Sequence, residues 1–173
     1  MQNFEERLKV GHPNSLGNTV EIVDEVLAEN GCFDELFNCY FSHDEVVRLR
    51  TSNAMKRICK AKKLLLIPYI NQFLIDVARI DQSSTQWTLS QLFGMLENDM
   101  NDEQIAQAKK IMKNNLANHN DWIVLSQTMD TLTKWATRDS ELGDWIMPYL
   151  ERLITDERKS VSGRAKKMLN KLQ

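Results

Sequence analysis

The chain has 173 residues, with 22 Lys and Arg against 24 Asp and Glu, a formal net charge of −2 and 42% hydrophobic residues. This balance does not indicate binding to nucleic acid or membrane surfaces through bulk charge, and the scarcity of glycine (6) and proline (3) argues against a many-stranded β protein. The longest apolar run, LLLIPYI, is too short to cross a bilayer, and the first residues lack the apolar core of a signal peptide. The three cysteines stand in no metal-binding spacing and favour reduced thiols, so we expect a soluble cytoplasmic protein without a cofactor.

A helical pattern with apolar residues at i, i+4, i+7 and i+11 recurs five times along the chain. The sets are Leu16, Val20, Val23, Leu27; Val47, Thr51, Ala54, Ile58; Leu89, Phe93, Leu96, Met100; Val124, Thr128, Thr131, Trp135; and Val161, Ala165, Met168, Leu172. A second apolar helical segment lies between successive sets: GCFDELFNCYF, KLLLIPYINQFLIDVARI, DEQIAQAKKIMKNNL and ELGDWIMPYLERLI. The segment NFEERLKV predicts one more short helix at the start.

Polar residues that can cap helix N-termini stand just before many of these segments. The candidates before the apolar sets are Asn14 or Ser15, Asp44, Ser83 or Ser84, and Asp121; those before the other helices are Asn101 or Asp102, Ser140 and Asp156. Gly31 stands where a helix C-terminus favours a left-handed residue. Pro68 and Pro148 occur in the similar phrases IPYINQFL and MPYLERLI, and each should start or kink its helix.

The spacing of the five sets indicates a repeat architecture. Their first residues are separated by 31 to 42 residues, which is typical of a helix pair that cannot bury its own apolar faces and stacks on its neighbours. No Gly/Ser-rich or Pro-rich linker interrupts the chain. We therefore predict an all-α fold, an α-solenoid of about five antiparallel helix pairs, formed by a single domain over residues 1–173.

Two segments resemble the second helix of a HEAT repeat, a member of the armadillo-like α-solenoids. DEVVRLRTSNAMKRI, residues 44–58, has an acid, then Val-Arg, then small and apolar residues at fixed offsets; DERKSVSGRAKKMLNKL, residues 156–172, is similar but has Ser162 at the arginine position. The resemblance implies a right-handed superhelix whose second helices line the concave side. Most proteins with HEAT repeats are scaffolds for other macromolecules, and a minority act on DNA. The resemblance therefore also implies a scaffold.

Charge is strongly segregated along the chain. Residues 11–47 contain no Lys or Arg, whereas residues 48–63 contain seven and no acid. With about 3.6 residues per turn, several basic residues fall at equivalent helical offsets next to the apolar stripes. These residues, with one adjacent amide, are Arg50, Asn53, Arg57, Lys134, Arg164 and Lys171. They predict a surface for an anionic partner, although neighbouring acidic and basic helices pairing with each other would explain the same pattern.

Two tryptophans, Trp87 and Trp122, each stand two residues before an apolar set. They are candidates for an aromatic platform that contacts bases or peptide side chains, and the alternative is a packing role between repeats. Trp135 is expected to be a core residue, and Trp145 is expected to pack between helices. HEAT-like DNA alkylation-repair glycosylases combine tryptophans with a carboxylate, but here Gln91 and Ser126 stand four residues after the two tryptophans.

No catalytic constellation accompanies these features. His12, His43 and His119 lack the spacing of a helical metal site, and no nucleotide-binding or nucleophile motif is present. We therefore predict a non-catalytic scaffold or adaptor that binds another protein, with an acidic segment docking on the basic residues. The alternative is a nucleic-acid-binding protein distantly similar to the alkylation-repair solenoids but without glycosylase activity. No membrane partner is expected.

Overall fold

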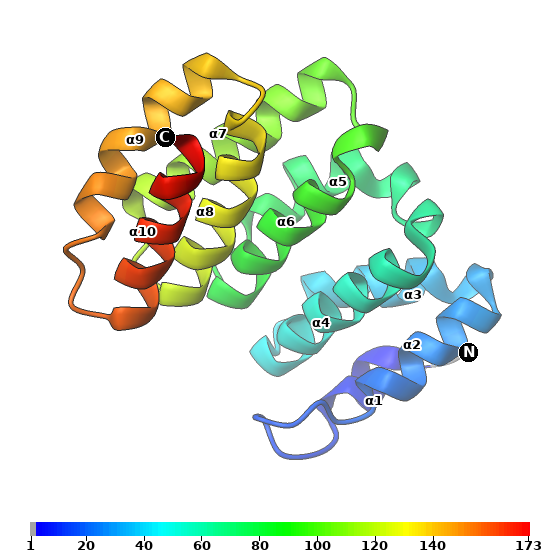
Figure 1. Cartoon of the computed structure of the whole chain (residues 1–173). Coiled ribbons are helices and arrows are strands. Elements are labelled where there is room, and N and C mark those ends of the chain that lie inside the picture. The colour runs from blue at the N-terminus through cyan, green and yellow to red at the C-terminus, as the bar shows by residue number, and fades with distance from the viewer. Residues whose placement is uncertain (1–2) are drawn as a thin grey trace. The chain divides into compact units, whose positions relative to one another are not determined.

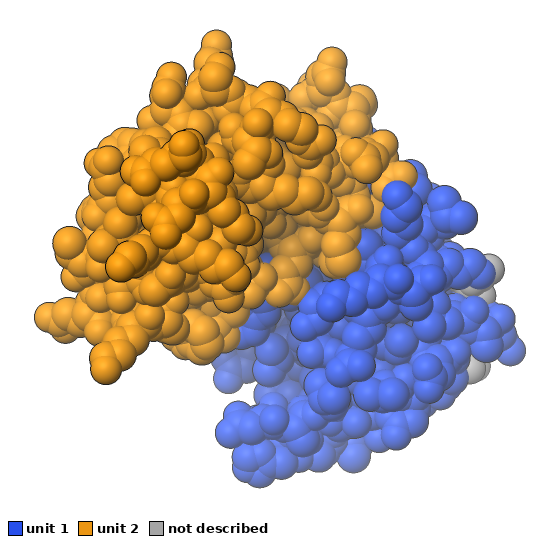
Figure 2. All heavy atoms as spheres, viewed as in Figure 1, with its two compact units in different colours: residues 1–88 blue, residues 89–173 orange. Residues whose placement is uncertain are grey.

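The computed structural model describes residues 3–173, and these contain ten α-helices, six short 3-10 helices and no β-strand (Figure 1). The predicted all-α class is confirmed. The chain divides into two compact units, residues 1–88 and residues 89–173 (Figure 2). Each unit has its own core, and the prediction of a single domain stays a prediction.

The first unit is built around the longest helix, α4. Its α-helices are α1 (Phe4–Lys9), α2 (Thr19–Ala28), α3 (Phe33–Asn38), α4 (Glu45–Lys62), α5 (Ile70–Ile75) and the first part of α6 (Ser83–Met95). The 3-10 helices are η1 (Asn30–Cys32), η2 (Cys39–Phe41), η3 (Lys63–Leu65), η4 (Ile67–Tyr69) and η5 (Val77–Arg79). Helices α1, α2 and α3 all pack against α4, so α4 is the central helix of the unit.

Helix α4 forms where the sequence predicts it. Asp44 caps it, because its carboxylate accepts hydrogen bonds from the backbone N–H groups of Val46 and Val47. The whole predicted apolar set of this helix, from Val47 to Ile58, is fully buried. Burial of one stripe leaves the opposite side of α4 for solvent.

The second unit is an arrangement of helix pairs joined by short loops. It contains the end of α6, η6 (Glu97–Asp99), α7 (Asp102–Asn118), α8 (Trp122–Ala136), α9 (Ser140–Leu153) and α10 (Lys159–Leu172). Helix α8 lies at the centre and packs against α7, α9 and α10. All four residues of its predicted set, Val124 to Trp135, are buried, and Thr131 Oγ1 donates to the carbonyl oxygen of Ser90 at 2.8 Å.

Several predicted helix boundaries are confirmed. Asp121 caps α8, and Asn101 forms a reciprocal capping box with Gln104 at the start of α7. Pro68 lies in η4 just before α5, in agreement with a role in starting a helix, whereas Pro148 lies inside α9.

Other local predictions are wrong. Helix α2 begins at Thr19 after Asn18, not after Asn14 or Ser15, and Gly31 lies in η1 without a left-handed backbone. The N-cap of α9 is Asp139 instead of Ser140, and α10 begins after Arg158 instead of Asp156. Asp139 caps α9 because its carboxylate accepts from the backbone N–H of Leu142, whereas Asn18 and Arg158 precede α2 and α10 without a side-chain capping hydrogen bond.

None of the helices within residues 3–173 is both long enough and apolar enough to cross a lipid bilayer.

Candidate functional site

Arg50 was predicted to contact a partner, but the structure buries it. Its side chain is 1% exposed, and its guanidinium donates to four backbone carbonyls at the N-terminal end of the chain. The acceptors are the carbonyl oxygens of Leu8, Val10 (2.7 Å), His12 (2.8 Å) and Ser15 (3.2 Å). A guanidinium with its donors used in this way cannot reach an external partner. Arg50 therefore fixes the loop between α1 and α2 instead of binding a ligand.

Glycines allow this loop to close around Arg50. Gly11 and Gly17 both have positive φ, which strongly favours glycine. A Cβ atom at Gly17 would lie 2.5 Å from the carbonyl oxygen of Val10 and 2.7 Å from Nη1 of Arg50. The loop can therefore approach the guanidinium only with glycine at this position.

Two of the other predicted basic residues are paired with acids. Lys134 Nζ lies 2.9 Å from the Glu97 carboxylate, and Arg164 Nη1 lies 3.2 Å from that of Asp130. Burial by itself raises the pKa of Glu97, but the hydrogen bond and charge of Lys134 outweigh it and the pKa is lowered. At these two positions, neighbouring acidic and basic residues pair with each other, which is the alternative explanation of the charge pattern. Lys171 is exposed at the end of α10.

Two of the predicted residues, Asn53 and Arg57, lie on a solvent-accessible side of α4. Arg57 is exposed, and its Nε donates to Oδ1 of the half-buried Asn53 at 2.7 Å. Lys56 and Lys60 join them, so that the four residues follow the i, i+3, i+4, i+7 spacing of one helix face. We call Asn53, Lys56, Arg57 and Lys60 the basic face of α4.

The basic face carries positive charge without a local counter-ion. Within residues 3–173, no carboxylate forms an ion pair with Lys56, Arg57 or Lys60. Partial burial lowers the pKa of Lys56, and repulsion from Lys60 and Arg57 lowers it further. An approaching anion would relieve this repulsion, which makes the basic face the strongest candidate for a binding surface in the first unit.

A cavity of about 330 Å³ lies at the other end of the same helix. Trp87, which is half-buried, forms one wall together with Glu45, Val46 and Leu49 from α4 and Pro13 from the α1–α2 loop. Its other lining residues are Asn14, Gln82, Ser83 and Ser84. We call this the Trp87 pocket. The second predicted tryptophan, Trp122, is 48% exposed at the start of α8.

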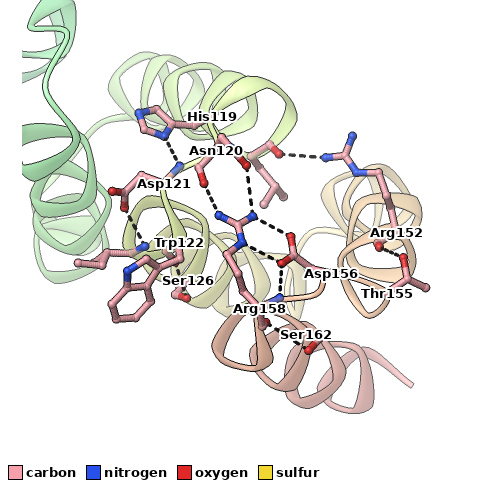
Figure 3. A network of polar contacts seen from close by, with 12 residues as sticks. His119, Asn120, Asp121, Trp122, Ser126, Arg152, Thr155, Asp156, Arg158 and Ser162 are labelled. Carbon is pink, nitrogen blue, oxygen red and sulfur yellow. Dashed lines mark hydrogen bonds and ion pairs between the residues drawn. The ribbon is translucent and has the colours of Figure 1, made fainter.

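A network of polar contacts in the second unit surrounds Arg158 (Figure 3). Its guanidinium contacts both carboxylate oxygens of Asp156, at 2.8 and 2.7 Å, and also donates to the backbone carbonyl of Asn120. It thereby ties the α7–α8 loop to the α9–α10 loop. A cavity of about 400 Å³ lies beside it, with Arg152 on its rim, but Arg158 is already held by acceptors of the chain itself. We read this network as structural.

The Asp156–Arg158 pair predicts a specific acid sensitivity. Hydrogen bonding to Arg158 lowers the pKa of Asp156 to about 2, against about 3.9 in an unfolded chain. A lowered folded-state pKa means that the pair stabilises the fold fully above the unfolded value, and that this stabilisation is lost as pH falls through about 2. Asp156→Asn should therefore reduce the free energy of unfolding at pH 7, and the difference from the wild type should shrink between about pH 4 and pH 2. Urea titrations across this range measure it, with the exposed Asp144→Asn as control; a difference that does not depend on pH would contradict it.

The sequence prediction did not include three of these residues. They are Lys56 and Lys60 of the basic face and Glu45 of the Trp87 pocket. The signal was present, because Lys56 and Lys60 are three and seven residues after Asn53. The residues described contain no cluster of three or more His, Cys, Asp or Glu side chains that could hold a metal ion.

Comparison of the chain with protein-family models, with curated proteins and with solved structures found no match in any of the three.

Proposed function

We propose that this chain is a non-catalytic protein-binding module that docks an acidic segment of another polypeptide on the basic face of α4. The observation that carries the proposal is the cluster of Lys56, Arg57 and Lys60 on one helix face without an ion-pair partner among residues 3–173. Charges without an ion-pair partner keep their attraction for an external anion, whereas Lys134 and Arg164 are partly neutralised by their own acids.

A protein segment suits this surface better than a nucleic acid. The same side of α4 that carries the basic face begins with the exposed carboxylate of Glu45, and the Asp44 carboxylate lies just before it. A phosphate backbone is negative along its whole length and would be repelled at this end of the helix. A polypeptide can carry charges of either sign at different positions.

We further propose that the helices form HEAT-like pairs stacked as a right-handed α-solenoid. Residues 89–173 support this arrangement, because α7 with α8 and α9 with α10 are joined by short loops and α8 also packs against α10 of the next pair. In such a stack the second helix of each pair is suited to contact a partner, and α4 would be such a helix. The proposed location is the cytoplasm, since no disulfide bond joins Cys32, Cys39 or Cys59.

Charge reversal of the basic face tests the proposal. The triple variant Lys56→Glu, Arg57→Glu, Lys60→Glu should weaken binding of a fluorescein-labelled glutamate-rich peptide by about tenfold or more, because attraction becomes repulsion. Fluorescence anisotropy from low to physiological salt measures the affinity. The matched control is Lys110→Glu, Lys166→Glu, Lys167→Glu, which changes net charge equally at exposed positions of the second unit.

Three results would overturn the proposal. The first is equal loss of affinity in the control triple, which would indicate a net-charge effect only. The second is no binding of the glutamate-rich peptide even at low salt. The third is tighter binding of labelled single- or double-stranded DNA than of the peptide, lost in the same α4 variant, which would establish the nucleic-acid alternative instead.

A further inference from the structure

The Trp87 pocket and the basic face lie on the same side of α4. Viewed along a helix with about 3.6 residues per turn, Val46 and Leu49 from the pocket fall in line with Asn53 and Lys60 from the basic face. One end of this side is therefore lined by a carboxylate and a tryptophan, and the other by three cations. The opposite charges make the surface bipolar.

The pocket has the chemistry of a site for a cationic side chain. Its single charged lining residue is Glu45, and its walls include the indole of Trp87 with the apolar Leu49 and Pro13. An indole face attracts a cation, and a nearby carboxylate adds a direct charge interaction. The apolar walls suit the aliphatic stem of lysine or arginine, which is commonly buried along apolar surface while the charged end finds a polar partner.

The indole of Trp87 is open to such a ligand, in contrast to the aromatic rings of α9. Lys113 Nζ lies 4.7 Å above the Trp145 ring, and the Arg152 guanidinium lies 5.3 Å from the centre of the Tyr149 ring. Within the described residues no cation of the chain covers Trp87, and none forms an ion pair with Glu45. Arg48, one turn after Glu45, is the nearest cation along α4, and its guanidinium is engaged by Oε1 of the pocket residue Gln82 and by the carbonyl oxygen of Ser42, to which it donates.

We propose that the Trp87 pocket binds a lysine or arginine side chain of the same partner segment whose acidic residues dock on the basic face of α4. The inference rests on the proposed function and narrows the partner to a charge-bipolar segment. From Glu45 to Lys60 the helix rises about 22 Å at 1.5 Å per residue. An extended peptide covers this length in about seven residues, which sets the separation between the cation and the acids.

The test uses labelled peptides that carry one lysine about seven residues from a pair of glutamates. Both sequence orders are synthesised, because the chain direction of the partner on α4 is not fixed by its charges. In a matched peptide of each order, the lysine is replaced by glutamine. Wild-type protein should bind the lysine peptide of one order about tenfold more tightly than its glutamine counterpart, as cation–π and ion-pair contributions together predict.

Substitutions in the pocket should remove this difference and leave the acid-dependent binding intact. Glu45→Gln changes an exposed side chain and should reduce the lysine preference to about twofold, and Trp87→Leu should do the same where circular dichroism shows that it folds. The matched controls are Glu141→Gln and Trp122→Leu, an exposed carboxylate and an exposed tryptophan of the second unit. Both should retain the full preference.

The outcomes separate this inference from the proposed function. If the lysine and glutamine peptides bind equally well and both lose affinity in the Lys56, Arg57, Lys60 charge-reversal variant, the proposed function holds and the pocket assignment is wrong. An equal loss of lysine preference in the control variants also overturns the assignment. If neither peptide binds through the basic face, both proposals fail together.

Discussion

Arg50→Met should destabilise the first unit by about 3 to 5 kcal/mol, which is among the largest effects expected from a single substitution in this chain. Methionine fills similar space but donates no hydrogen bond. The carbonyl groups of Leu8, Val10 and His12 would lose the donors that satisfy them in the wild type. Each buried polar group left without a partner costs about 1 to 3 kcal/mol. Urea denaturation followed by circular dichroism measures the loss.

Arg57→Met is the matched control, since Arg57 lies seven residues later on the same helix and is exposed. Its guanidinium is exposed and donates to the neutral Asn53, and such a side chain contributes little, so the free energy of unfolding should change by no more than about 0.5 kcal/mol. Equal stability losses in the two variants would show that Arg50 does not hold the α1–α2 loop as described.

Phe37→Ala should reduce the free energy of unfolding by about 3 to 5 kcal/mol, because Phe37 is 2% exposed at the centre of an aromatic cluster. Its ring centroid lies 4.8 Å from that of Tyr69, 5.3 Å from Phe73 and 5.9 Å from Tyr40. Truncation removes the buried area of the ring and leaves a cavity among rigid neighbours that cannot collapse to fill it. The same urea titration measures the effect.

Phe41→Ala provides the comparison within the same cluster. Phe41 contacts the Phe37 ring at 6.1 Å but is 50% exposed, so less of its area leaves water on folding. We expect a loss of about 1 kcal/mol or less. A loss as large as that of Phe37→Ala would mean that ring–ring contact, and not burial, sets the stability of the cluster.

The apolar stripes of α4 and α8 could be predicted from sequence because these helices are covered on a wide face by several neighbours. Every residue of the sets that begin at Val47 and Val124 is buried. The set that begins at Leu16 is only partly correct, because Val23 is buried as predicted and Leu27 is half-buried. Leu16 and Val20 are 39% and 40% exposed, and α2 instead buries the face that contains Ile22 and Val26. This segment has enough apolar residues for two overlapping stripes, so periodicity alone cannot select the buried one.

Sequence spacing alone is also insufficient to predict the candidate site. Arg50 and Arg57 are seven residues apart, about two turns along the same flank of α4, and their spacing predicts the same role for both. They differ because a loop some forty residues earlier places its carbonyl groups around Arg50 only, and local spacing does not record that contact. The Trp87 pocket could not be predicted for the same reason, since Trp87, Glu45 and Pro13 meet only after three separate segments have folded.

The carbonyl groups around Arg50 have a consequence for the behaviour of the chain toward small ions. In Arg50→Ala the same oxygens would line a vacant socket shaped to a planar cation with several N–H donors. The variant should therefore act as a receptor for free guanidinium. At millimolar concentrations, guanidinium chloride should raise its melting temperature relative to potassium chloride at equal ionic strength, and should leave the wild type unchanged. A common denaturant would then serve this variant as a ligand that restores the missing side chain, as mass action requires of any solute bound only by the folded state.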